Sequence, residues 1–299
     1  MDVEQQGVAR HADRTVVVGV DASPEAEHAL QWARSVAGDG GRIVVVHAWE
    51  LPLVTGYDVV ITIDPTEIER LSEQGLHELV ERVGDARIEP VTRQGHAGRA
   101  IVAEADEHDA DLVVVGHRGS GRMSLMLGST ANYVLHHTAR PVVVVRGDTP
   151  TPARRVVVGV DDHDLDDLEG HEENPSVRAV RWATSLPGVE EVRVVHSWFL
   201  PALAVGMFAT VATEMDTMDA GAREIVHRVL DAAGPMPDGI EVTGEPVRGT
   251  PGFALIEASR DVDLVVVGSR GRGGFSGLLL GSTSAEVAAH AHCPVAVIR

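Results

Sequence analysis

An internal repeat that covers nearly all of the 299 residues is the feature that most constrains the fold. The first copy contains RTVVVGVD, IVVVHAW, DADLVVVG, LGST and RPVVVVR, and the second contains RRVVVGVD, VRVVHSW, DVDLVVVG, LGST and CPVAVIR in the same order. The offset between matching residues drifts from 140 at Asp21 and Asp161 to 153 at Pro141 and Pro294, as expected for two copies of one domain with a few loop insertions. We therefore predict domains at 14–146 and 154–299, joined by a Pro- and Thr-rich linker at 147–153.

Composition restricts the class of protein. The hydrophobic fraction of 44% is typical of globular chains, so each copy has enough apolar residues for its own core. The formal net charge of −20 disfavours a general binder of nucleic acid or anionic membrane, because phosphate groups require clustered Lys and Arg. A single cysteine, Cys293, excludes an intrachain disulfide, and residues 1–14 lack the apolar core of a signal peptide. No apolar run approaches the roughly 20 residues of a membrane span, so we expect a cytoplasmic protein.

Valine-rich runs alternate with amphipathic stretches in both copies. In the first copy the apolar runs have strand length and are near-continuous, which is typical of parallel strands covered on both faces: Val16–Val20, Ile43–Ala48, Leu112–Val115 and Val142–Val145. Helices are predicted at 24–36, 65–83 and 99–109, the first with Ser23 as N-cap and Pro24 at its first position. This alternation predicts an α/β fold with an open, doubly wound parallel sheet in each half.

Polar and glycine residues follow the predicted strands, where open parallel sheets bind ligands. Asp21 and Asp161 follow the first strand of each copy, and the last part of the second copy reads GSRGRGGFSGLLLGST after a strand. Glycines let phosphate approach the backbone N–H groups, and Gly281-Ser282-Thr283 would open a helix at Ser284–His290 whose N-terminal field favours anions. The pattern is neither G-x-G-x-x-G nor G-x-x-x-x-G-K-[ST], but it predicts a phosphate-binding loop.

These residues resemble the universal stress proteins, specifically the tandem two-domain kind common in actinobacteria, over roughly 14–146 and 154–299. ATP-binding members of that family carry a glycine, two residues, a second glycine, nine residues and then Gly-Ser or Gly-Thr. The second copy matches this pattern in full with Gly268, Gly271 and Gly281-Ser282. The first copy has Gly116, Gly119 and Gly128-Ser129 with eight residues in the last interval, and a missing residue can shift Gly128 relative to the earlier glycines.

The resemblance implies two Rossmann-like, adenine nucleotide alpha hydrolase-like domains, each an open five-stranded parallel sheet with helices on both faces. It implies that the glycine clusters hold ATP phosphates with Mg²⁺, that the aspartates contact the ribose and that nearby backbone lines an adenine slot. The implied binding residues are, in domain 1, Gly19, Asp21, Ala48, Gly116, Gly119, Gly128, Ser129 and Thr130, and in domain 2, Gly159, Asp161, Ser197, Gly268, Gly271, Gly281, Ser282 and Thr283. It also implies that the terminal strands pair across the domain interface as an intrachain pseudo-dimer, and two such chains can associate further as a homodimer.

The sequence favours binding over catalysis, because no set of nucleophile, base and oxyanion donor recurs in both copies. The expected role is therefore an ATP-dependent sensor of stress or energy state, with an unidentified protein partner. Two alternatives stay open: a nucleotide-free interaction module in which the glycines only form turns, and a slow ATPase. Asp21 and Asp161 have the alternative role of capping local turns.

Several other residues are assigned structural roles. His47 and His196 are interpreted as core histidines with backbone partners, and Trp32 and Trp182 as helix packing residues.

The acidic insertion 161–173 places acidic side chains at positions 1, 3, 5 and 12 of a calcium-loop register, but Asp167 replaces the turn glycine. A solvated acidic loop is favoured there over a calcium site or a weak divalent-ion site. His290, His292 and Cys293 lack a second ligand cluster, so Cys293 is expected to pack beside the last strand.

Overall fold

The computed structural model describes residues 13–21, 23–51, 64–117, 127–147, 151–161, 174–199, 211–269 and 280–299. In the first copy, strands and helices alternate as β1 (Thr15–Val20), α1 (Pro24–Val36), β2 (Arg42–Trp49), α2 (Pro65–Val83), β3 (Ile88–Gln94), α3 (Ala97–Glu107), β4 (Leu112–Gly116), α4 (Ser129–His137) and β5 (Val142–Val145). In the second they run β6 (Arg155–Gly159), α5 (Pro175–Thr184), β7 (Glu191–Trp198), α7 (Val211–Ala233), β8 (Glu241–Arg248), α8 (Pro251–Ala258), β9 (Leu264–Gly268), α9 (Ser282–His290) and β10 (Val295–Ile298).

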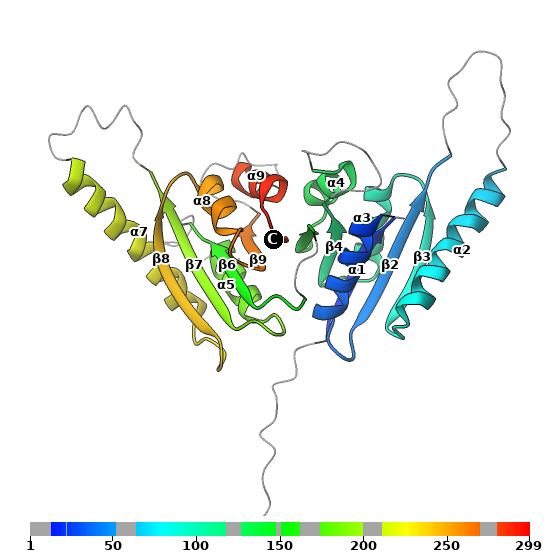
Figure 1. Cartoon of the computed structure of the whole chain (residues 1–299), viewed down its shortest axis with the longest axis horizontal. Helices are drawn as coiled ribbons and strands as arrows, with labels where there is room; N and C mark the ends of the chain where they lie inside the picture. Colours follow the sequence, from blue (N-terminus) through cyan, green and yellow to red (C-terminus); the bar gives the residue numbers. More distant parts are fainter. Residues whose placement is uncertain are drawn as a thin grey trace, which may run out of the picture.

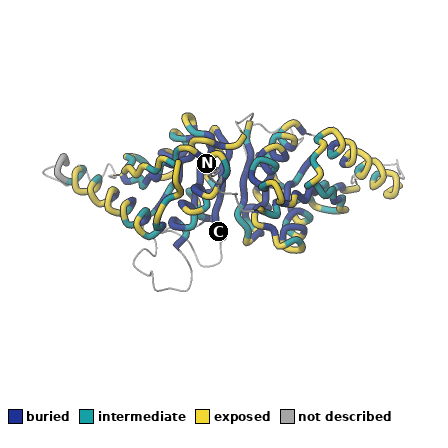
Figure 2. Tube along the Cα trace, turned by 90° about the horizontal axis from the view of Figure 1, so that it is seen from below, coloured by how far each residue is buried: buried dark blue, intermediate teal, exposed yellow. Residues whose placement is uncertain are grey.

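The strands form one ten-stranded sheet in the order β3-β2-β1-β4-β5-β10-β9-β6-β7-β8. Each half is parallel, and the two halves meet where β5 and β10 pair antiparallel. Helices α1, α2, α5 and α7 cover one face of the sheet, and α3, α4, α8 and α9 cover the other (Figure 1). Figure 2 shows buried strands through the middle of the molecule and large exposed surfaces on the outermost helices. The predicted α/β architecture is confirmed, with the two predicted sheets joined into one.

The junction between the halves is built symmetrically. Val143 pairs with Ala296, its equivalent in the other copy, so an approximate twofold axis passes between them. Two equivalent arginines cross this axis: Arg146 donates to the carbonyl oxygens of Ala288 and Ala289 at the C-terminal end of α9, at 2.9 and 2.7 Å, and Arg299 donates to that of Leu135 in α4. A guanidinium at a helix C-terminus interacts favourably with the helix dipole. The expected pairing of the terminal strands across the interface is confirmed.

The sequence predicts most of these elements well, with two kinds of error. Helices α1 and α2 have the predicted bounds, and Ser23 caps α1 by accepting from the Ala26 N–H. The predicted helix 99–109 is displaced by two residues, because α3 begins at Ala97 and the left-handed φ of 48° at Asp109 is incompatible with helix. The outermost strands β3 and β8 have no counterpart among the predicted apolar runs, since edge strands carry polar residues and here also Pro90 and Pro246.

Apolar contacts explain several residues that the sequence assigned to packing. Trp32 is buried in α1, and Trp182 of α5 packs against the same core. Cys293 is buried directly before β10, where it packs with the residues of the α8–α9 face, as predicted. In the described part of the chain, no helix combines the length and apolar character that a membrane crossing requires.

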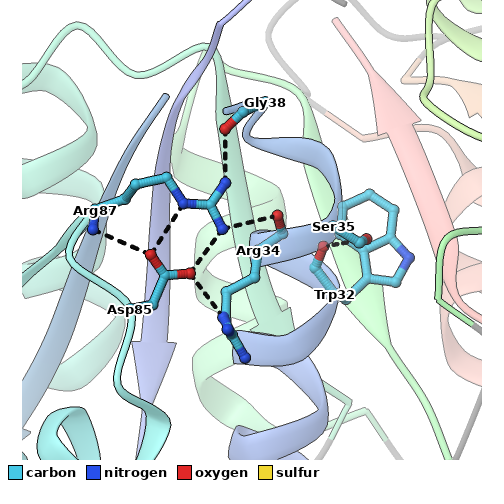
Figure 3. A network of polar contacts seen from close by, with 6 residues as sticks. All are labelled: Trp32, Arg34, Ser35, Gly38, Asp85 and Arg87. Atoms are coloured by element: carbon cyan, nitrogen blue, oxygen red, sulfur yellow. Dashed lines mark hydrogen bonds and ion pairs between the residues drawn. The ribbon is translucent and has the colours of Figure 1, made fainter. Parts of the chain in front are cut away.

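Asp85 is the centre of a polar network on the first copy (Figure 3). Its carboxylate accepts from the Arg87 side chain at 2.6 and 3.0 Å and from Arg34 Nε at 2.8 Å, and Arg87 also donates to the Gly38 carbonyl at 2.6 Å. These donors, Arg87 first, hold the pKa of Asp85 well below its usual range. The network ties the loop before β3 to the C-terminal part of α1.

We predict that Asp85→Asn lowers the free energy of unfolding at pH 7 by roughly 1.5–3 kcal/mol, the range for hydrogen bonds to charged groups. A carboxyl whose pKa is lowered by folding stabilises the protein above its unfolded pKa and loses this effect as the pH falls toward its folded pKa. The stability difference between the two proteins should therefore shrink below about pH 4. Urea unfolding from pH 7 to pH 3 measures it, and a difference independent of pH would contradict the assignment.

A buried carboxylate, Glu104 of α3, distinguishes the first copy from the second. Glu104 accepts from Arg93 Nε at 2.6 Å, and His108 Nε2 lies 3.4 Å from its other oxygen. When the two copies are aligned, β3 matches β8 and α3 matches α8. In this alignment Val247 stands at the position of Arg93, and Ala258 at the position of Glu104. One backbone arrangement thus accepts a buried carboxylate paired with a half-exposed arginine in one copy and apolar side chains in the other.

We predict that Arg93→Val alone destabilises domain 1 by roughly 3 kcal/mol, because it leaves the Glu104 carboxylate buried without its main partner. The double variant Arg93→Val with Glu104→Ala, which reproduces the residues of the second copy, should recover most of this loss. Chemical denaturation of both variants measures the difference. Equal or additive losses would show that the pair does not act as a unit.

Candidate functional site

Each half of the sheet has a reversal point, where successive strands stop adding to one side of the first strand and begin adding to its other side. β2 and β3 lie on one side of β1 whereas β4 and β5 lie on the other, and β6 divides the second copy in the same way. Ligands bind outside the carboxyl ends of the strands at such a point in open α/β sheets. We call the region beyond the ends of β1 and β4 site 1 and that beyond β6 and β9 site 2. The register sets Gly19 beside Val115 in site 1 and Gly159 beside Val267 in site 2.

The described ends of the two glycine loops have the same geometry. The Gly128 N–H donates to the His117 carbonyl at 2.9 Å, and the Gly281 N–H donates to the Ser269 carbonyl at 2.7 Å. His117 and Ser269 are held in turn by equivalent bonds, both 2.7 Å, from their N–H groups to Val145 and Ile298. The one-residue difference in loop length therefore leaves the start and end of the loops matched. Gly119 and Gly271 lie outside the described residues.

The last glycine of each loop precedes a helix. Gly281 is the N-cap of α9, which therefore starts at Ser282 and not at the predicted Ser284, and Gly128 is the N-cap of α4. Their φ and ψ values of −61° and 150° for Gly128 and −78° and 159° for Gly281 are extended and open to any residue. Helices α1, α2 and α5 have Ser, Asp and Asn caps whose side chains accept from the first turn. At α4 and α9 no cap side chain shields the first-turn N–H groups from an incoming anion.

The hydroxyl residues that follow these glycines lie at the surface. Ser129 and Ser282 are exposed, and Thr130 and Thr283 are partly exposed. All four belong to the first turn of α4 or α9, so their side chains and N–H groups are available at the same helix end. Gly116 and Gly268 end β4 and β9 and begin the loops that lead to these helices. The structure thus brings the described glycine, serine and threonine candidates of each copy to one edge of the sheet.

The two aspartates follow the first strand of each copy, but their surroundings differ. Asp21 Oδ1 accepts from the N–H of Ser23 at 2.9 Å and from its hydroxyl, so Asp21 supports the cap of α1. The turn-capping role that the sequence left open is therefore present in site 1. In site 2 the Asp161 N–H donates to Ser176 Oγ at 3.0 Å. The acidic insertion after Asp161, including the calcium-loop positions at 162–173, lies outside the described residues.

Residues at the ends of β2 and β7 complete the edge. His47 Nδ1 lies 3.1 Å from the Val20 carbonyl, and His196 Nδ1 lies 2.8 Å from that of Val160. A carbonyl only accepts, so Nδ1 carries the proton in both rings, and the prediction of histidines with backbone partners is confirmed. Ala48 and Ser197 follow these histidines and pair with Arg93 and Val247 of the neighbouring strands.

Glycine at the ends of β1 and β6 has a packing reason that sequence reasoning missed. A Cβ on Gly19 would overlap Ile101 of α3, and one on Gly159 would overlap Leu255 of α8. These two glycines let the helix approach the strand closely, whatever lies beyond the strand end. Also missed was Arg248, whose guanidinium lies 5.9 Å from the Trp198 ring in the second copy. Arg248 is the last residue of β8, an edge strand that the sequence pattern did not predict.

Comparison with known proteins gives consistent matches over the whole length. The model of the Universal stress protein family matches residues 13–146 and 152–299. A universal stress protein of Mycolicibacterium smegmatis is 29% identical over 300 residues, covering 95% of this chain and 96% of the relative. One of Mycobacterium tuberculosis is 28% identical over 298 residues with the same coverage. A crystal structure of a universal stress protein from Archaeoglobus fulgidus aligns over 96% of both chains with a TM-score of 0.62 and 21% identity, a likeness of fold.

Proposed function

The chain belongs to the universal stress protein family, and from this premise we propose that it binds ATP at site 1 and site 2 as a sensor of stress or energy state. The observation that carries the proposal is the pair of glycine-capped helices, α4 and α9, at the reversal point of each half-sheet. Their backbone conformation does not require glycine, and a residue without a side chain leaves room for a ligand at the helix end. First-turn N–H groups that donate to no cap side chain at Gly128 or Gly281, together with a positive helix end, suit the phosphates.

The remaining candidate residues receive roles by family resemblance. Asp21 and Asp161 would contact the ribose, and the backbone at Gly19, Ala48, Gly159 and Ser197 would line the adenine slot. Among the described residues no group of three or more His, Cys, Asp or Glu side chains is arranged to hold a metal ion. We therefore propose that Mg²⁺ enters with the triphosphate, bound mainly by phosphate oxygens. Gly119 and Gly271 stay predicted phosphate contacts.

We propose binding without efficient turnover. His47 and His196, at the ends of β2 and β7, each commit Nδ1 to a strand carbonyl, and this bond fixes their rings as part of the sheet edge. ATP would then act by stabilising the domains that hold it and by shifting the surface available to a partner protein. A nucleotide-free interaction module and a slow ATPase are the competing functions. A cytoplasmic location and pairing of two chains are further parts of the proposal.

Mass spectrometry of the denatured, purified protein separates these functions. Co-purifying ATP, or retention of ATP after incubation at millimolar concentration and removal of the excess, supports binding. Retention of unhydrolysed ATP over hours favours a sensor over an ATPase, whereas stoichiometric release of ADP would favour the enzyme. A protein that retains no nucleotide after incubation would leave the interaction module as the better account.

A substitution at the helix cap tests the role of the glycines more sharply. Gly281→Asp supplies a better N-cap and a favourable charge for the helix dipole, so we expect the ligand-free protein to gain about 0.5–1 kcal/mol of stability. The same carboxylate would occupy and repel the phosphate position, so ATP binding at site 2 should be lost. Gly128→Asp should do the same at site 1.

Calorimetric titration with MgATP, alongside thermal unfolding without ATP, measures both effects. Each single variant should retain one binding event and the double variant none, although all three remain at least as stable as the parent. Because stability and binding are expected to move in opposite directions, general damage to the fold cannot imitate the result. Full ATP occupancy in the double variant would contradict the assigned phosphate positions.

A further inference from the structure

The two copies differ in two buried hydroxyl groups that flank site 2. Ser176, in the first turn of α5, accepts from the Asp161 N–H at 3.0 Å, and its own hydroxyl lies 3.3 Å from the Asp161 carbonyl oxygen. Ser284, in the first turn of α9, donates to the Gly268 carbonyl at 2.7 Å. Both side chains are buried. Ser284 therefore fixes the last residue of β9, and Ser176 fixes the backbone just beyond the end of β6.

The equivalent positions in the first copy carry no hydroxyl. The match of Trp32 with Trp182 and of Ala33 with Ala183 sets α1 and α5 in register, and it places Ala26 at the position of Ser176. The match of Gly128 with Gly281 likewise places Ala131 at the position of Ser284. Ala26 and Ala131 are as buried as the two serines. Site 1 thus lacks both of these bonds.

We propose that Ser176 and Ser284 are positioning residues that hold site 2 in its ATP-binding geometry and make it the tighter of the two sites. This inference rests on the proposed function and deepens it. The residues concerned, Asp161 and Gly268, are those assigned to the ribose and to the start of the phosphate loop. Backbone that is already fixed loses less conformational freedom when a ligand binds. The smaller entropy cost makes binding tighter. Neither serine needs to touch the nucleotide.

The test uses site 2 alone, in the full chain carrying Gly128→Asp. Ser176→Ala and Ser284→Ala each remove one hydroxyl, and both create an alanine that the first copy already tolerates at the same buried position. We expect each to weaken MgATP binding about three- to tenfold, the equivalent of one lost hydrogen bond. The variant with both substitutions should weaken binding by roughly the product of the two factors if the two serines act independently.

Ser259→Ala is a matched control in the same domain. Ser259 is also buried, donates to the Ile256 carbonyl and accepts from the His292 N–H at 2.8 Å, but it caps the C-terminal end of α8, away from the strand ends of site 2. Its loss should lower the thermal stability as much as the loss of Ser176 or Ser284 while leaving the affinity for MgATP within about twofold, well under the effect of one hydrogen bond.

The reverse exchange tests the same idea at site 1. In a chain carrying Gly281→Asp, Ala131→Ser supplies the missing hydroxyl opposite the end of β4, and we expect MgATP to bind about two- to fivefold more tightly there. Unchanged affinity in both serine-to-alanine variants, or an equal loss in Ser259→Ala, would overturn the positioning role. Failure of the unsubstituted chain to bind MgATP would instead overturn the proposed function, and the positioning role with it.

Discussion

The antiparallel pairing of β5 with β10 is the interaction on which the rest of the structure depends. Each strand is the last of its half-sheet and is fully apolar, so either would present an exposed edge in an isolated domain. Pairing satisfies both edges at once, and the symmetric register with Val143 opposite Ala296 makes one chain equivalent to a twofold dimer. Arg146 and Arg299 then lock a helix of each copy to the last strand of the other. Apolar cores on both faces of the sheet run through this junction.

Within this common frame, in which both halves have the same strand order, the copies have diverged in buried polar groups. The first copy holds Glu104 with Arg93 where the second has Ala258 and Val247, and the second holds Ser176 and Ser284 where the first has alanines. Buried polar groups fix a geometry when all members are satisfied, and they are costly when one partner is lost. The Glu104 pair ties α3 to the end of β3, where Arg93 pairs with Ala48 of β2. The two serines instead hold the backbone at the ends of β6 and β9. Each copy thus anchors its sheet edge through a different set of polar contacts.

The sequence was sufficient for the α/β class, the duplication, the bounds of α1 and α2 and the edge at which the candidate residues gather, because these follow from apolar periodicity, helix capping and strand order. It was insufficient for β3 and β8, whose polar residues, Pro90 and Pro246 reflect their places at the two ends of the sheet. The packing role of Gly19 and Gly159 also escaped it, because that role depends on Ile101 and Leu255, about 80 to 100 residues away along the chain. The domain limits and the individual ligand contacts stay predictions. Long-range packing decides such details, and local patterns do not encode it.

The central claim is that phosphate lies against the glycine-capped N-termini of α4 and α9. A crystal structure of the protein with MgATP or a non-hydrolysable analogue tests it most directly. The account predicts triphosphate density within hydrogen-bond distance of the N–H groups that follow Gly128 and Gly281, with the base on the side of β2 and β7. Density for the nucleotide elsewhere, or both helix ends covered by protein side chains in crystals that contain saturating nucleotide, would contradict it.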